Sequence, residues 1–120
     1  MSTNPRMALR YIEVSARFIA FHQYPDAPDQ VAFLREPHRH VFHVLAQLYV
    51  QHDDRDLEFF MVQAKLNAFL REWEGENLGA RSCEMLAEAI ALYLEACYPE
   101  RVRLVSVSED GENRGVMEYV

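Results

Sequence analysis

Two stretches of the chain alternate apolar and polar residues, and this period of two is the feature that most limits how the chain can fold. The first stretch runs from about Leu9 to Phe21 and the second from Phe42 to Val50, with a segment rich in proline and aspartate between them. Because successive side chains of a strand point to opposite faces, each stretch predicts a strand with one buried face. We expect the two strands to pair in antiparallel orientation.

The rest of the chain predicts two helices followed by two more strands. Apolar residues recur at spacings of three and four from about Leu57 to Trp73, after possible N-capping residues in HDDRD. A second amphipathic helix begins after Ser82, a typical N-cap, and stops at Pro99. The segments RVRLVSVSE and RGVMEYV then predict a hairpin around the turn DGEN. The simplest packing of this order is an α+β domain, with a four-stranded antiparallel sheet and both helices on one face.

Composition indicates the number of domains, the cellular location and some partners that the protein does not bind. With 120 residues, half of them apolar, we expect one domain over residues 1–120. Cys83 and Cys97 lie about 21 Å apart along the second predicted helix, too far for a disulfide, which favours the cytoplasm. No apolar run approaches the roughly 20 residues of a membrane span. The net charge of −7 and the scattered arginines argue against nucleic-acid binding.

Strand parity places three histidines together. His22 follows the buried face of the first strand, and His38 and His40 precede the buried face of the second. In an antiparallel pair the end of one strand lies beside the start of the other, so the three imidazoles should converge on the side of the sheet that the helices cover. His43 has the opposite parity and should point away. Three histidines with an open fourth position are a common catalytic zinc site, and solvated histidines at strand ends are the alternative.

The histidine segments also resemble those of a known enzyme family. FIAFH and PHRHVFHV are similar to the pattern F-x-A-x-H … H-G-H-x-(F/Y)-x-V of the 6-pyruvoyltetrahydropterin synthases, a family that includes the 6-carboxytetrahydropterin synthases. The resemblance covers nearly the whole chain. It implies the ββααββ unit of the tunnelling fold, which assembles into an oligomeric barrel, here a homotrimer or homohexamer. It also implies a zinc cofactor held by His22, His38 and His40, and a pterin or guanine-like small molecule as the ligand.

The resemblance extends to residues that would contact a substrate. VSVSEDGENRGVMEY looks like the family's closing hairpin and places Glu109 where the family anchors the pterin ring. A carboxylate suits this task because the 2-amino group and N3–H of the ring are two parallel donors. SCEMLAEAI resembles the start of the family's second helix, which makes Ser82 and Cys83 candidate substrate-binding residues. A reactive thiol is a second interpretation of Cys83, and packing as a small apolar residue is the simpler one.

The family's proton-transfer residues are the part that the chain does not match. Family synthases carry a cysteine shortly before the H-x-H, and VAFLREP contains none. In the family's L-D-H segment, Glu74 replaces the aspartate and Gly75 replaces the histidine. A branch of the family instead uses a glutamate just before the H-x-H and cleaves the side chain of dihydroneopterin.

Glu36 lies about one residue from the position of that glutamate, which makes it a candidate general base. The alternative is a surface residue paired with Arg35 or Arg39. Glu74 is the next candidate for proton transfer. Two functions therefore remain open from the sequence. One is a zinc-dependent lyase acting on a dihydropterin, and the other is a metal- and pterin- or purine-binding protein of the same fold without synthase activity.

Overall fold

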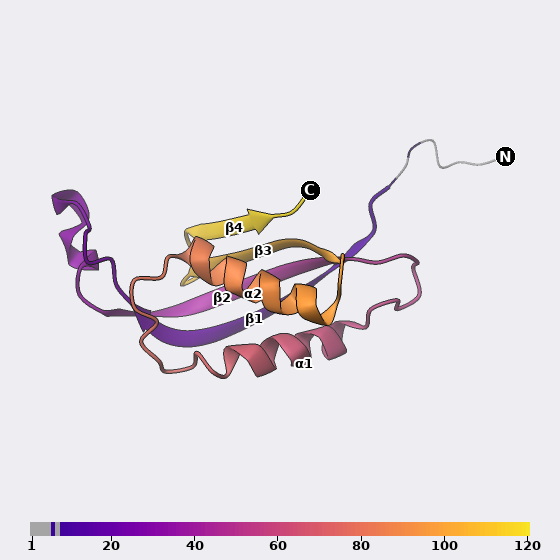
Figure 1. Cartoon of the computed structure of the whole chain (residues 1–120), viewed down its shortest axis with the longest axis horizontal. Coiled ribbons are helices and arrows are strands. Elements are labelled where there is room, and N and C mark those ends of the chain that lie inside the picture. The colour runs from indigo at the N-terminus through magenta and orange to yellow at the C-terminus, as the bar shows by residue number, and fades with distance from the viewer. Residues whose placement is uncertain (1–5, 7) are drawn as a thin grey trace.

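A computed structural model describes residue 6 and residues 8–120 of the chain. Its sheet has four antiparallel strands in the order β1-β2-β3-β4, with the bounds β1 Tyr11–His22, β2 His38–Tyr49, β3 Val102–Glu109 and β4 Arg114–Glu118. Helices α1 (Phe59–Leu70) and α2 (Cys83–Cys97) both lie against one face of the sheet (Figure 1). The predicted α+β fold class is therefore confirmed.

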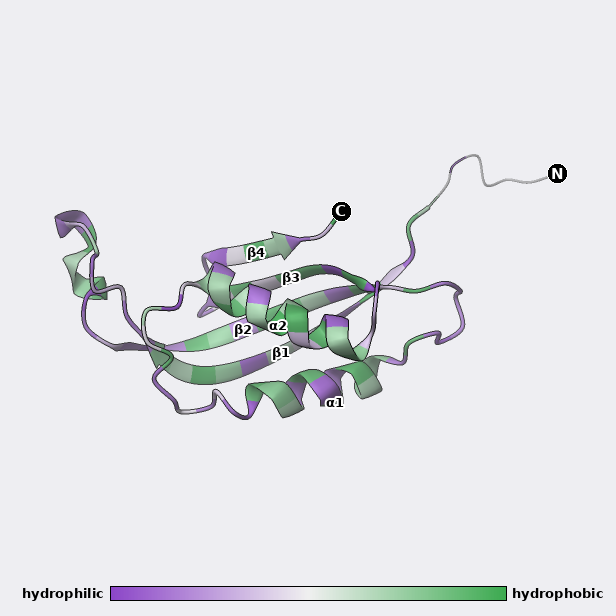
Figure 2. Cartoon of the chain, in the orientation of Figure 1, coloured by the Kyte–Doolittle hydropathy of each residue, from purple (hydrophilic) through white to green (hydrophobic). Residues whose placement is uncertain are grey.

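The core lies between this face and the two helices. The largest side chains that are fully buried come from the sheet and from both helices: Phe18, Phe42, Leu48, Leu66, Leu86, Ile90 and Leu94. Phe18 and Phe42 stack with their ring centroids 5.0 Å apart, which joins β1 to β2 beside the histidines of the predicted metal site. The alternation of hydropathy along the two strands, visible in Figure 2, is the pattern that places these rings on the buried face.

One end of the sheet brings together the segments that contain the candidate site residues. Strand β1 ends there, β2 begins there, and the hairpin between β3 and β4 lies beside them (Figure 1). The N-terminus of α2 lies over the same end, and Ser82 is its N-cap, since its hydroxyl accepts the N–H of Met85 at 3.2 Å. A short 3₁₀ helix, η1 (Asp29–Leu34), interrupts the segment between β1 and β2.

Several predicted boundaries are wrong. The first helix begins at Phe59 rather than at about Leu57, and its N-cap is Glu58 rather than a residue of HDDRD, because the Glu58 carboxylate accepts the N–H groups of Phe60 and Met61. It ends at Leu70 rather than Trp73, since the Trp73 N–H donates to the carbonyl of Leu70, three residues earlier, and not to a carbonyl four residues earlier as in an α-helix. Strand β1 ends at His22 rather than Phe21, and β2 begins at His38 rather than Phe42, so the histidines lie within these strands rather than beside them.

No helix in the described part of the chain combines the length and apolar character that a membrane crossing requires.

Candidate metal centre

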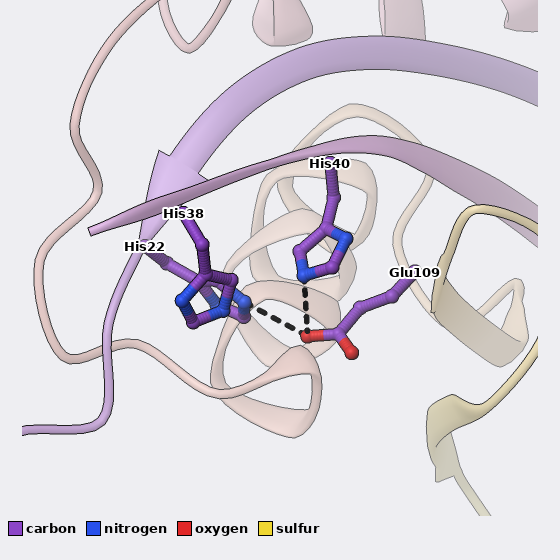
Figure 3. Close-up of side chains that lie close together, drawn as sticks. All are labelled: His22, His38, His40 and Glu109. Carbon is purple, nitrogen blue, oxygen red and sulfur yellow. Dashed lines mark ion pairs between the residues drawn. The ribbon is translucent and has the colours of Figure 1, made fainter. Parts of the chain in front are cut away.

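The register of β1 and β2 brings the three histidines to one place. His22 lies directly opposite His38, and His40 lies opposite Ala20 on the same face. The three ring centroids are 4.6 to 5.3 Å apart. Figure 3 shows the rings directed toward one another, with Glu109 approaching from the end of β3. Glu109 reaches this point because it pairs with Phe42, two residues after His40 on the same face of the sheet.

The four side chains present a set of donor atoms suited to a metal ion. One ligand atom from each of His22, His38, His40 and Glu109 lies within 4.8 Å of the others. The Glu109 Oε2 atom is 2.8 Å from His22 Nε2 and 3.6 Å from His40 Nε2. The ligand atoms of a tetrahedral zinc, with bonds near 2.0–2.2 Å, are about 3.3–3.5 Å apart. The observed spacings bracket that value, so small side-chain movements suffice to bind such an ion.

Each histidine is oriented by an oxygen atom on the far side of its ring. The Nδ1 atom of His22 lies 2.9 Å from the carbonyl oxygen of Arg81, and that of His38 lies 2.9 Å from the carbonyl oxygen of Glu36. The Nδ1 atom of His40 lies 2.7 Å from a carboxylate oxygen of Asp110. Because these oxygens only accept hydrogen bonds, they assign the proton to Nδ1 and leave the Nε2 lone pair free to bind a metal.

The Nε2 atoms of the three histidines are buried and have no hydrogen-bond partner in the described chain. Glu109 lies at ion-pair distance from His22, but the contact is not aligned as a hydrogen bond. Each buried acceptor without a donor costs about 1–3 kcal/mol. A cation among the three atoms would remove this cost, and nitrogen with carboxylate oxygen is a donor set that zinc accepts. The residues present therefore fit the metal that the sequence motifs imply.

Asp110 holds His40 in place through two further contacts with the next residue. Its second carboxylate oxygen accepts the N–H of Val41 at 3.0 Å, and its own N–H donates to the Val41 carbonyl at 2.8 Å. The Val41 hydrogen bond, and after it the one from His40, lowers the pKa of the Asp110 carboxyl below its usual value. Asp110 is therefore an anion at neutral pH. The sequence analysis missed this residue, and its place in the turn after Glu109 was the available signal.

A cavity of about 380 Å³ adjoins the histidine cluster. Its lining includes His22, His38 and Glu109 from the sheet, and Arg81, Ser82 and Cys83 from the start of α2. This volume is in the range of small-molecule sites. Both substrate-binding candidates of α2 thus lie on the wall opposite the sheet.

The thiol of Cys83 is not activated. Burial, followed by the charges of Glu109 and Glu84, raises its pKa to about 12, so the thiol is protonated at neutral pH. The side chain packs in the hydrophobic core while lining the cavity. The structure supports the packing interpretation over the reactive one.

The two candidate proton-transfer residues lie outside the cluster of donor atoms. Glu36 is exposed and contributes its backbone carbonyl, which accepts from His38. The Glu74 carboxylate accepts the N–H of Ile19 at 2.8 Å, and the residues after Glu74 run parallel to the edge of β1 as far as Gly79. Glu74 therefore covers part of an edge strand in the single chain.

His43 lies on the opposite face of the sheet, as its parity predicts. It lines a second cavity of about 490 Å³, together with Arg17 and Arg114. The cavity beside the histidine cluster, unlike the one beside His43, joins atoms that could bind a metal to space for a ligand.

Comparison of sequences finds no protein-family model and no curated protein that matches the chain. Comparison of structures does find matches. The 6-pyruvoyl tetrahydropterin synthase of Caenorhabditis elegans superposes with a TM-score of 0.75 at 15% identity, covering 96% of this chain and 99% of that one. An uncharacterized protein from Wolinella succinogenes gives a TM-score of 0.69 at 12% identity, with 95% and 100% covered.

A third match is the 6-pyruvoyltetrahydropterin synthase of Plasmodium vivax, in a form in which a catalytic glutamate is replaced by alanine. Its TM-score is 0.71 at 12% identity, with 94% of this chain and 99% of that chain covered. The chain therefore has the fold of the 6-pyruvoyl tetrahydropterin synthases, the family that its histidine and hairpin motifs resemble.

Proposed function

We propose that the protein is a zinc-dependent lyase of the 6-pyruvoyl/6-carboxytetrahydropterin synthase type that acts on a dihydropterin related to dihydroneopterin. The observation that carries the proposal is the set of three buried Nε2 atoms, each freed by an oxygen at Nδ1, beside a cavity of small-molecule size. This set occurs in the fold of the pterin synthases.

Different residues of the site would hold the metal and the substrate. His22, His38 and His40 would hold the ion, which polarises oxygen atoms of a substrate side chain when it is bound. Glu109 would accept the two parallel donors of the pterin ring. Ser82 and Cys83, which also line the cavity, would contact the ligand from the side of α2.

Proton transfer is assigned to Glu36, with cleavage of the substrate side chain as the reaction. The Plasmodium vivax match has a catalytic glutamate, which supports a carboxylate as the base in this fold. The Glu36 carbonyl bonded to His38 fixes the backbone of Glu36 two residues from a metal ligand. Glu74 is the second candidate, and its use would require the carboxylate to leave the Ile19 N–H.

A second function is favoured by a specific observation. Glu36 is exposed, Glu74 is engaged by the backbone, and Gly75 has no side chain to transfer a proton. A protein with this site that binds a metal and a pterin or purine, without synthase activity, is consistent with these positions. Recognition by Glu109 and the histidines would be the same in both functions.

We further infer a cytoplasmic homotrimer or homohexamer built from one domain of residues 1–120. The outer strands of the sheet are β1 and β4, and the segment after Glu74 covers β1 only at its end. Unpaired strand edges favour pairing between subunits. Tyr11 and Val116 on these strands are each 42% exposed, which leaves apolar surface for such a contact. Light scattering that shows a monomer at micromolar concentration would contradict this assembly.

Metal analysis combined with product analysis tests the function. Protein purified without added metal or chelator should contain about one zinc per chain. Dihydroneopterin and its triphosphate are then incubated with this protein, with the chelated protein and with the zinc-reloaded protein, and products are identified by mass spectrometry. Zinc-dependent product formation supports the lyase, and ring binding without turnover supports the binding protein. Absence of metal would refute both.

A further inference from the structure

We propose that Glu109 is a fourth metal ligand while the cavity is empty, and that binding of a guanine-type ring withdraws it and frees one coordination position. This inference rests on the proposed function because it concerns the same site. It assigns one carboxylate two alternative partners, so that the metal is shielded until a ring ligand is present.

The first observation is where the Glu109 side chain points. Figure 3 shows its carboxylate directed into the group of imidazoles. Oxygen Oε2 lies 2.8 Å from His22 Nε2 and 3.6 Å from His40 Nε2, both of which are metal-binding atoms. Neither contact is a hydrogen bond, so the oxygen takes the place of a ligand rather than that of a proton acceptor. Four donors of this kind complete a tetrahedral zinc site.

The second observation is that Glu109 also borders the cavity. Its side chain is 31% exposed and contributes to the cavity wall beside Ser82. A guanine-type ring presents two parallel N–H donors, which need both oxygens of a carboxylate in one plane. If Oε2 binds a metal among the histidines, as its 2.8 Å distance from His22 Nε2 suggests, only the other oxygen is left for the ring. Ring binding and metal ligation by Glu109 therefore exclude one another.

The neighbouring carboxylate cannot take over either role. Both oxygens of Asp110 are engaged, one by His40 Nδ1 and one by the Val41 N–H. The two consecutive acids thus differ in function: Glu109 contacts metal-binding atoms, and Asp110 orients the His40 ring through its Nδ1 atom. This difference supplies a matched pair of substitutions that each remove one negative charge from adjacent residues.

A thermodynamic consequence follows from the exclusion. Guanine, which has no side chain to replace the carboxylate, should weaken metal binding, and metal should weaken guanine binding by the same factor. A dihydropterin with side-chain hydroxyl groups compensates at the freed position and should show less of this antagonism. The size of the antagonism therefore separates ring recognition from recognition of the side chain.

The experiment uses Co²⁺, whose visible absorption reports the number and type of its ligands. Purified protein is stripped, titrated with Co²⁺ and compared with Glu109→Gln, Asp110→Asn and Glu112→Gln, the last removing a charge from the same exposed turn. Glu109→Gln should change the shape of the spectrum and weaken binding by more than the roughly 10–100-fold typical of an outer-shell partner. Asp110→Asn should weaken binding while keeping the wild-type spectrum, and Glu112→Gln should change neither. Circular dichroism checks that each variant is folded.

Addition of guanine to the wild-type Co²⁺ protein should then give the spectrum of Glu109→Gln. A Glu109→Gln spectrum identical to wild type at saturating Co²⁺ would overturn the proposal. So would guanine binding that leaves the wild-type spectrum unchanged, or guanine and Co²⁺ affinities that do not depend on one another. These outcomes leave metal binding by the histidines intact, and they differ from failure of the proposed function, in which wild-type protein binds no metal.

Discussion

Replacing Asp110 with asparagine should weaken metal binding although no metal ligand is removed. In the wild type, one oxygen of Asp110 lies 3.0 Å from the Val41 nitrogen and the other lies 2.7 Å from Nδ1 of His40. If the side-chain oxygen of asparagine accepts the Val41 N–H, its amide NH₂ faces Nδ1 of His40. A donor at this position favours the tautomer with its proton on Nε2, and that tautomer cannot bind a metal.

The magnitude follows from the cost of restoring the correct tautomer. Turning the amide so that its oxygen faces His40 leaves the Val41 N–H opposite a second donor. An unsatisfied backbone group of this kind costs about 1–3 kcal/mol, equivalent to roughly 5- to 150-fold in affinity. This agrees with the roughly 10–100-fold effect of losing outer-shell partners of metal-binding histidines.

Competition with a chromophoric zinc chelator measures the affinity directly. Wild type, Asp110→Asn and the control Glu112→Gln are compared at constant pH and ionic strength, because an exposed charge acts only through a screened field. We expect a loss for Asp110→Asn within the range above and wild-type affinity for the control. Equal affinities for all three proteins would show that Asp110 does not orient His40. Equal losses in both variants would assign the effect to charge alone.

Four other outcomes are expected. Alanine at any of the three proposed histidine ligands should abolish zinc binding measured by elemental analysis, whereas His43→Ala should retain it because His43 lies on the other face. Glu36→Gln should abolish side-chain cleavage while zinc content stays unchanged, and persistent cleavage would remove Glu36 as the base. Gly115→Ala should lower the free energy of unfolding by about 1–3 kcal/mol, because the Cβ of alanine would lie 2.6 Å from the backbone nitrogen of Glu84. Folding lowers the pKa of Asp110, so its contribution to stability is present at neutral pH and is lost as the pH falls below 3.8 and through the folded pKa. The difference in unfolding free energy between wild type and Asp110→Asn should therefore shrink progressively in unfolding curves measured at increasingly acidic pH.

The features that the sequence predicted well depend on local periodicity. Alternation along β1 and β2 determines which side chains share a face, so the parity of His22, His38 and His40 could be read without knowing any tertiary contact. The start of α2 was equally readable, because Ser82 followed by an amphipathic pattern is a local signal. The fold class followed from the order of these elements.

The features that the sequence did not predict depend on competition between distant groups. Asp56 in HDDRD was a reasonable N-cap, but its carboxylate accepts the Gln51 N–H at 2.7 Å and pairs with Arg101. Capping of α1 therefore passes to Glu58. Trp73 continues the apolar spacing of the helix and packs 5.4 Å from Phe18, and this contact forms whether or not the residue is helical. Apolar spacing could not reveal where α1 ends.

The roles of the two acids after β3 have the same origin. Asp110 meets Val41 only because β2 and β3 pair in a register that joins residues about 70 positions apart, and no local pattern encodes that register. The same register places Glu109 opposite Phe42, on the inward face next to His40. In an antiparallel pair, inward positions two residues apart lie within reach of long side chains on the neighbouring strand. The Glu109 carboxylate at the end of β3 is therefore held within reach of the three histidines by the sheet itself, and the coupling proposed for Glu109 needs no moving loop.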